Sequence, residues 1–249
     1  MMKKIFAANW KLNKTPEQAR EFVIQFKNEA FKHADFFKTC EVILFPQAFG
    51  LEAVSSLCAG TEIGFGPQNI YFEKSGAFTG ENSAEVASVA LKAKFALIGH
   101  SERREIFKEI DGQLNKKNIL VQSLKMTSVF CIGESLQQRE AFQTLPVCFA
   151  QLDAGLAGLD QNVRVIVAYE PVWAIGTGKV ATLEQVAEVH QAINDKLEAR
   201  GFKSFQILYG GSVKADNAAS LLKVPHVDGF LIGGASLEVS SFLNVCLAN

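Results

Sequence analysis

Eight short apolar segments, rich in valine, isoleucine and phenylalanine, recur along the whole chain. They cover residues 5–8, 42–45, 63–65, 95–98, 128–132, 163–169, 205–209 and 229–232. They do not alternate apolar with polar residues, so a strand formed by any of them would be buried on both faces. Such strands are typical of a parallel sheet that helices cover. The pattern therefore predicts an α/β fold with eight parallel strands.

Helical segments separate these runs. Thr15 can cap the clearest of them, and Pro16 suits its first turn. Its apolar residues share one face: Ala19, Phe22, Val23 and Phe26. Thr182 and Gln185 repeat the capping pattern, and Gly201 is a plausible stop for that second helix. The second helix is predicted to place five residues on one face: Leu183, Val186, His190, Ile193 and Leu197.

The units of strand and helix average about 31 residues, which is the size of a typical βαβ unit. No linker rich in proline or serine divides the chain, so residues 1–249 are interpreted as one domain. We expect a closed (β/α)8 barrel, with an open doubly wound sheet as the alternative. In both folds the chemistry belongs at the carboxyl ends of the strands.

Charge and composition limit the partners. With 25 basic and 26 acidic residues the net charge is -1, so the chain has no bulk positive field for nucleic acid or anionic lipid. No apolar run approaches the roughly 20 residues of a membrane span, and residues 5–8 are too few for a secretory signal. We therefore expect a cytoplasmic protein. The five cysteines and four histidines lack the spacing of a disulfide framework or a zinc site.

Polar residues and glycine pairs follow several of the predicted strands. In a closed barrel they would converge on one mouth, and this convergence is the functional signal. The set comprises Asn9 and Lys11 after the first strand, His100 and Ser101 after the fourth, Glu170 after the sixth, and glycines 210–211 and 233–234 after the last two.

Glu170 is the candidate general base. A strand-end carboxylate can also be exposed or salt-bridged within a barrel, so its context matters. Pro171 follows it, and residues 173–178 show neither strand nor helix character, as expected of a lid. A lid that expels water would raise the basicity of the carboxylate.

His100 is the candidate electrophile, although a core histidine bonded to backbone is an alternative. Residues 101–105 look like the start of a helix, whose N-terminus disfavours imidazolium. A neutral His100 would donate to a carbonyl and stabilise an enediolate. Lys11 would attract a dianionic phosphate and Asn9 would add a neutral donor, although a solvated lysine and a turn asparagine remain alternatives.

The glycine turns after strands seven and eight suggest phosphate binding, because glycine lets backbone N–H groups approach an anion. Barrel enzymes often bind phosphate there, and Gly234 is expected near the N-terminus of the last helix. Ordinary turns are the alternative.

Residues 176–181 match a dinucleotide pattern, but that pattern must lead directly from a strand into a helix. Here the strand ends near Tyr169 and the helix is capped by Thr182.

Five motifs together resemble the triosephosphate isomerase family over nearly the whole chain. They are Asn9-Trp10-Lys11, Gly99-His100-Ser101-Glu102-Arg103-Arg104, Tyr169-Glu170-Pro171-Val172-Trp173-Ala174-Ile175-Gly176-Thr177-Gly178, Tyr209-Gly210-Gly211-Ser212-Val213 and Gly229-Phe230-Leu231-Ile232-Gly233-Gly234-Ala235. The resemblance implies a TIM barrel that interconverts dihydroxyacetone phosphate and D-glyceraldehyde 3-phosphate in glycolysis and gluconeogenesis, with no cofactor or metal. A neutral histidine electrophile and a closing loop are documented features of that family.

The same resemblance assigns roles to single residues. Glu170 would be the base and His100 the electrophile, with Lys11 and Asn9 steadying the developing charge. Phosphate would be held by Gly176, Ser212, Gly233 and Gly234, beneath a lid of residues 171–181. Glu102 and Cys131 would support the site. Residues 68–81 would dock into a second subunit, with Thr79 near its site, to form a homodimer.

Three positions depart from the family pattern: Lys14 stands where glycine is common, Gln47 where proline is common, and residues 65–67 replace a smaller sequence. They bear on the expected interface and not on the catalytic set. Two other functions remain open. A sugar-phosphate epimerase would share the glycine turns but need a different acid and base pair, often with metal ligands. A barrel that has lost catalysis would act as a binding protein, without need for Lys11, His100 and Glu170 together.

Overall fold

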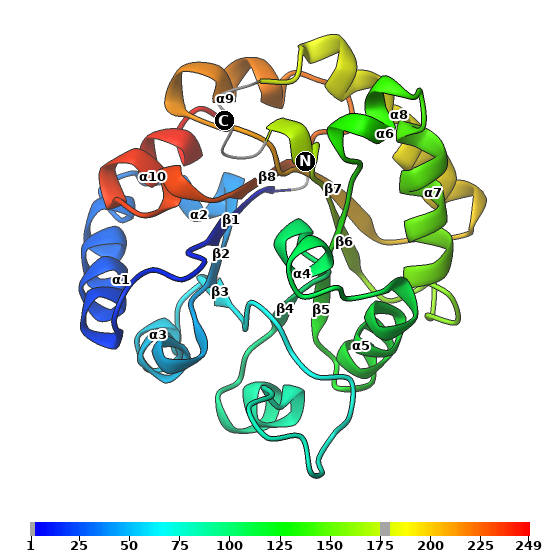
Figure 1. Cartoon of the computed structure of the whole chain (residues 1–249). Coiled ribbons are helices and arrows are strands. Elements are labelled where there is room, and N and C mark those ends of the chain that lie inside the picture. The colour runs from blue at the N-terminus through cyan, green and yellow to red at the C-terminus, as the bar shows by residue number, and fades with distance from the viewer. Residues whose placement is uncertain (1–2, 175–179) are drawn as a thin grey trace.

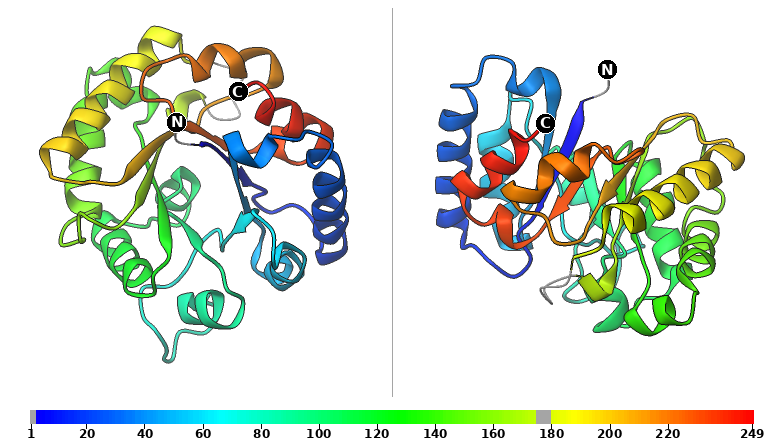
Figure 2. Two further views of the ribbon diagram at one scale, coloured as in Figure 1. Left: turned by 180° about the vertical axis from the view of Figure 1, so that it is seen from behind. Right: turned by 90° about the horizontal axis from the view of Figure 1, so that it is seen from above.

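The computed structural model describes residues 3–174 and 180–249. Eight parallel strands lie at the centre with helices around them (Figure 1), which confirms the predicted (β/α)8 barrel. The views from behind and from above show the helices outside the sheet (Figure 2). The strands are β1 (Lys4–Asn9), β2 (Cys40–Phe45), β3 (Gly64–Phe65), β4 (Phe95–Ile98), β5 (Thr127–Ile132), β6 (Val165–Tyr169), β7 (Phe205–Tyr209) and β8 (Gly229–Ile232).

The strand order is β3-β2-β1-β8-β7-β6-β5-β4, which leaves one seam between β3 and β4. Two backbone hydrogen bonds cross this seam. The amide of Lys94 donates to the carbonyl of Phe65 over 3.3 Å, and the amide of Leu97 donates to the carbonyl of Pro67 over 3.0 Å. Residues 65–67, which depart from the family pattern, therefore help to close the barrel.

The α-helices in the described part of the chain are α1 (Pro16–Ala30), α2 (Phe36–Thr39), α3 (Leu51–Cys58), α4 (Ser101–Glu105), α5 (Asp111–Ser123), α6 (Leu136–Glu140), α7 (Thr144–Gly155), α8 (Leu183–Ala199), α9 (Ala215–Leu222) and α10 (Val239–Cys246). Both predicted capping boxes form, at Thr15 and at Thr182. Of the five residues predicted to share one face of α8, four are buried, whereas Leu183, the first residue of the helix, is 41% exposed.

The core has two layers, as strands buried on both faces require. Alternate residues of every strand except β3 point into the barrel, where they form one cluster: Ile5, Ala7, Ile43, Phe45, Phe95, Leu97, Val129, Cys131, Ile166, Ala168, Leu208 and Leu231. Their strand neighbours, such as Phe6 and Phe130, pack outward against the helices. No helix in the described ranges has the length and apolar character that crossing a bilayer demands.

His190 is a buried histidine of α8 whose Nδ1 lies 2.9 Å from the carbonyl of His226. Burial lowers the pKa of His190 to about 4. The unfolded chain, in which a histidine has a pKa of about 6.5, therefore binds this proton first as the pH falls. We expect the free energy of unfolding to hold above about pH 7 and to fall by about 3 kcal/mol between about pH 6.5 and 4 through this residue alone.

Denaturant unfolding of His190→Asn across this pH range tests the expectation. The variant should lose that part of the pH dependence, whereas His33→Asn, at an exposed histidine, should keep it. A wild-type slope that persists in His190→Asn would show that other groups produce it.

Candidate active site

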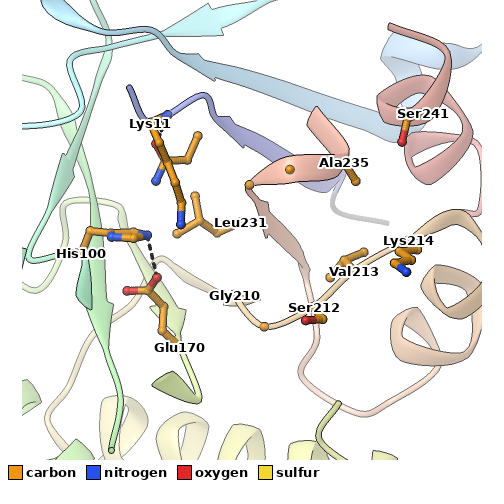
Figure 3. A pocket seen from close by; sticks show the side chains of 14 residues that line it. Lys11, His100, Glu170, Gly210, Ser212, Val213, Lys214, Leu231, Ala235 and Ser241 are labelled. Atoms are coloured by element: carbon orange, nitrogen blue, oxygen red, sulfur yellow. Dashed lines mark hydrogen bonds and ion pairs between the residues drawn. The ribbon is translucent and has the colours of Figure 1, made fainter. Parts of the chain in front are cut away.

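A cavity of about 530 Å³ opens at the carboxyl ends of the strands. Figure 3 shows Lys11, His100 and Glu170 gathered at one end of it, with Ser212 and Ala235 farther along. Seven predicted site residues line it: Asn9, Lys11, His100, Glu170, Ser212, Gly233 and Gly234. Gly176 and residues 175–179 of the expected lid lie outside the described residues.

Glu170 follows β6 and is 2% exposed. Its Oε2 accepts from the Ser101 amide over 3.0 Å, and its Oε1 lies 2.9 Å from His100 Nε2. Burial alone would raise the pKa of this carboxyl. His100, the Ser101 amide and the Cys131 thiol oppose that effect, and the pKa lies below its usual value. The pKa of Glu170 is thus lowered, whereas exclusion of water was expected to raise it. The reason is that these three donors stabilise the charged carboxylate.

Close backbone packing holds Glu170 in place. A Cβ on Gly133 would lie 1.8 Å from the Glu170 carbonyl oxygen, and one on Gly210 would lie 2.9 Å from its Cγ. Gln151 of α7 clamps Gly133 from the other side: its Oε1 accepts from the Gly133 amide over 2.8 Å and its Nε2 donates to the carbonyl over 3.1 Å. Larger residues at 133 or 210 would displace the carboxylate.

His100 directly precedes α4, which confirms the predicted helix at 101–105. Its Nδ1 accepts from the Glu102 amide over 3.3 Å, so the proton of the neutral ring lies on Nε2, which faces Glu170. Burial lowers the pKa of His100, but the carboxylates of Glu170 and Glu102 raise it by more, and it lies above its usual value. The amide at the start of α4 therefore selects the tautomer with its proton on Nε2. The carboxylates of Glu170 and Glu102 favour the protonated, positively charged form of the ring.

Lys11 lies just beyond β1, where its backbone adopts a φ of 51°. Its Nζ is 2.6 Å from Glu102 Oε1, so Glu102 does stand beside the lysine. Asn9 is buried, and its Oδ1 accepts from the Lys11 amide over 3.1 Å. Gln68 donates to the Lys11 carbonyl over 2.9 Å, which ties the start of the 68–81 loop to the lysine.

The two glycine turns line the cavity from Lys11 and Glu170 outward. Gly233 adjoins the lysine, since a Cβ added to it would lie 3.5 Å from Lys11 Cε. Gly234 begins a short 3-10 turn, Gly234–Ser236, and not the last helix, because α10 starts only at Val239. Ser212 donates its hydroxyl to the Ala174 carbonyl over 2.8 Å, so its backbone rather than its side chain is left to face a ligand.

Glu134 is the residue that sequence reasoning missed. It is fully buried after β5, and its Oε1 lies 3.0 Å from Trp173 Nε1, 3.2 Å from Tyr169 OH and 3.1 Å from Arg139 Nη1. The prediction that residues 173–178 have no helical character was wrong for Trp173 and Ala174. Both belong to a 3-10 turn, Val172–Ala174, which lies beside Glu134. A strand-end glutamate beside Gly133 was the available signal.

No group of three or more histidine, cysteine or acidic residues in the described ranges is arranged to hold a metal ion.

The dinucleotide pattern at 176–181 falls largely outside the described residues. The elements beside it argue against that reading, since β6 ends at Tyr169 and α8 begins at Leu183.

The fold and the site together define a (β/α)8 barrel with a carboxylate, a histidine and a lysine gathered in one cavity at the carboxyl ends of its strands. The chain matches the triosephosphate isomerase family over residues 4–249. It is similar to the triosephosphate isomerase of Bdellovibrio bacteriovorus, with 57% identity over 98% of this chain and 99% of the relative. Those of Solibacter usitatus and Clostridium novyi share 40% and 41% identity, over 98% and 97% of this chain and 99% and 97% of theirs. The chain therefore belongs to the triosephosphate isomerase family and is an isomerase.

Proposed function

We propose that the chain interconverts dihydroxyacetone phosphate and D-glyceraldehyde 3-phosphate through an enediolate, with Glu170 as the base and His100 as the electrophile. The observation that carries the proposal is the buried Glu170 carboxylate, 2.9 Å from His100 Nε2, in a cavity that also holds Lys11 and two glycine turns. Separately, these groups are common. Together they supply the parts of a proton transfer next to a carbonyl.

The proton path follows from this geometry. The Glu170 carboxylate takes the C2 proton of glyceraldehyde 3-phosphate, and the electron pair moves toward the C1 carbonyl oxygen. His100 Nε2–H and Lys11 stabilise the negative oxygen. Glu170 then returns a proton to C1, while the hydroxyl proton of O2 is passed to O1, which gives dihydroxyacetone phosphate. Because His100 Nε2 now faces Glu170, substrate oxygens must replace the carboxylate there, which turns Glu170 toward the substrate carbons.

The phosphate would lie over the glycine turns after β7 and β8. Backbone N–H groups at Ser212, Gly233 and Gly234 would donate to it, as barrel enzymes bind phosphate in this region. The Lys11 ammonium adds the positive charge at the boundary between the phosphate and the reacting carbons. Binding of the phosphate end would then fix the carbons against Glu170.

An assay coupled to reduction of dihydroxyacetone phosphate, run with and without a chelator, separates the candidate functions. The isomerase is expected to convert glyceraldehyde 3-phosphate at the same rate in both. Activity lost to the chelator would contradict a metal-free isomerase, and no turnover by folded protein would favour an epimerase of another sugar phosphate or a binding protein.

We also propose that the chain forms a homodimer through residues 68–81. A groove of about 660 Å³ shares Asn9, Lys11 and His100 with the catalytic cavity. Apolar side chains stand exposed on this face, with Leu12 at 89% and Phe107 at 62%. In the dimer, the tip of the 68–81 loop of the second subunit, which includes Thr79, would fill this groove. Since Gln68 holds the Lys11 carbonyl, docking of the loop would stiffen the catalytic lysine.

Sedimentation tests the homodimer. The wild type is expected to be a dimer, and Thr79→Arg is expected to dissociate it and to lower activity, because a long cation would enter a groove that Lys11 and Arg103 already line. Phe142→Arg is the matched control, since Phe142 is 91% exposed on the α6–α7 turn. A monomeric wild type, or an unaffected Thr79→Arg dimer, would contradict this interface.

A further inference from the structure

Lys14 is the residue of the β1–α1 loop that departs from the family pattern. Its φ is 69°, the left-handed conformation in which glycine is at ease and a lysine is strained. Such strain persists only where other contacts hold the residue. Gln47, a second departure, supplies two of them, because its Nε2 donates to the carbonyls of Asn13 over 3.3 Å and Lys14 over 2.8 Å. The two departures thus lie together.

The side chain of Lys14 reaches the turn after β8. Its Nζ donates to the carbonyl of Leu237 over 2.7 Å. It also lies 4.9 Å from the ring centre of Phe22 and 5.5 Å from that of Trp10, close enough for cation–π attraction. Burial lowers the pKa of Lys14, opposed by Glu238. The ammonium is half-buried and directed at one carbonyl.

Trp10 makes a parallel contact, since its Nε1 donates to the carbonyl of Ser236 over 3.2 Å. Two donors of the loop that carries Lys11 therefore hold two consecutive carbonyls, those of Ser236 and Leu237. These carbonyls stand at the C-terminal end of the turn that begins with Gly233 and Gly234. The Ser236 amide donates to the Gly233 carbonyl over 2.9 Å, and the Leu237 amide donates to that of Gly234 over 3.1 Å.

We propose that Lys14 is a positioning residue that holds the Gly233–Gly234 turn in its phosphate-binding arrangement beside Lys11. This inference rests on the proposed function, because it takes the turn as the phosphate site. By holding the Leu237 carbonyl, Lys14 fixes the peptide planes of the turn and with them the direction of the backbone N–H groups at its start. Without Lys14, the Leu237 carbonyl turns to water and the phosphate amides lose their fixed direction.

Competitive inhibition by inorganic phosphate, measured alongside KM and kcat, tests the role. In Lys14→Gly, whose backbone suits glycine, the Ki of phosphate and the KM of glyceraldehyde 3-phosphate are expected to rise together by about threefold to tenfold, with kcat within about twofold. Lys14→Met, which keeps an unbranched apolar side chain but not the ammonium, is expected to behave like Lys14→Gly. Lys14→Arg is expected to restore binding. Lys125→Gly is the control, a lysine with a φ of 57° that precedes β5 at the opposite end of the barrel.

Each outcome decides between the two claims. A wild type that phosphate does not inhibit overturns the phosphate site, and the role of Lys14 with it. Inhibition that is equal in wild type and folded Lys14→Gly overturns the role of Lys14 alone. A Lys14→Met variant with wild-type Ki also overturns it, because an apolar side chain would then suffice without the bond to Leu237.

Discussion

Shortening Glu170 to aspartate is expected to lower kcat by about a hundredfold or more and to leave KM within a fewfold. The backbone of Glu170 is held by the close packing of Gly133 and Gly210, so a carboxylate that is shorter by one methylene stops short of the substrate carbons when it turns toward them. A misplacement of about 1 Å can cost about a hundredfold in rate, while the phosphate contacts that set binding are untouched. Steady-state kinetics in both directions would measure the separation of kcat from KM.

The control for this prediction is Glu105→Asp, the same chemical change at an exposed residue of α4. It should leave both constants unchanged. Circular dichroism and the melting temperature would show that Glu170→Asp is folded. Wild-type kcat in folded Glu170→Asp, or an effect confined to KM, would mean that Glu170 does not move the proton.

Replacing Lys11 by methionine is expected to lower kcat/KM by about a hundredfold or more, through both a higher KM and a lower kcat. The ammonium adjoins Gly233 at the phosphate end and faces the reacting groups, so it acts on the bound dianion and on the charge of the enediolate. In the wild type the Lys11 ammonium lies 2.6 Å from Glu102 Oε1. Without the ammonium, Glu102 becomes an unpaired negative charge beside the substrate.

The double variant Lys11→Met with Glu102→Gln separates these effects, since removal of the unpaired carboxylate should recover part of the KM and little of kcat. Lys214→Met is the control, because Lys214 lines the far end of the same cavity. If Lys214→Met were as damaging as Lys11→Met, net positive charge would matter more than the position of Lys11.

The strands and the residues at their ends could be predicted because both are local properties of the chain. An apolar run buried on both faces defines a strand by itself, and the barrel then brings strand ends together without knowledge of any contact. Leu183 shows the limit of the same reasoning: a helical period places it on the apolar face but does not tell where that face meets the sheet.

Partners distant in the sequence could not be predicted. The pKa of Glu170 is lowered because the Ser101 amide and His100, about seventy residues earlier, donate to it. Burial, which the apolar strand did suggest, acts in the other direction. Likewise, Lys14 could be recognised as a departure, but nothing in its neighbourhood indicates a bond to Leu237, 223 residues away.

The most direct test of the proton transfer is the conversion of glyceraldehyde 3-phosphate by the wild type in D2O, followed by proton NMR. A base that holds the proton on a carboxylate exchanges it with solvent, so part of the dihydroxyacetone phosphate formed is expected to carry one deuterium at C1. Folded Glu170→Gln should form almost none of this product. Equal rates for the two proteins, or no dihydroxyacetone phosphate from the wild type, would contradict the assignment of Glu170 as the base.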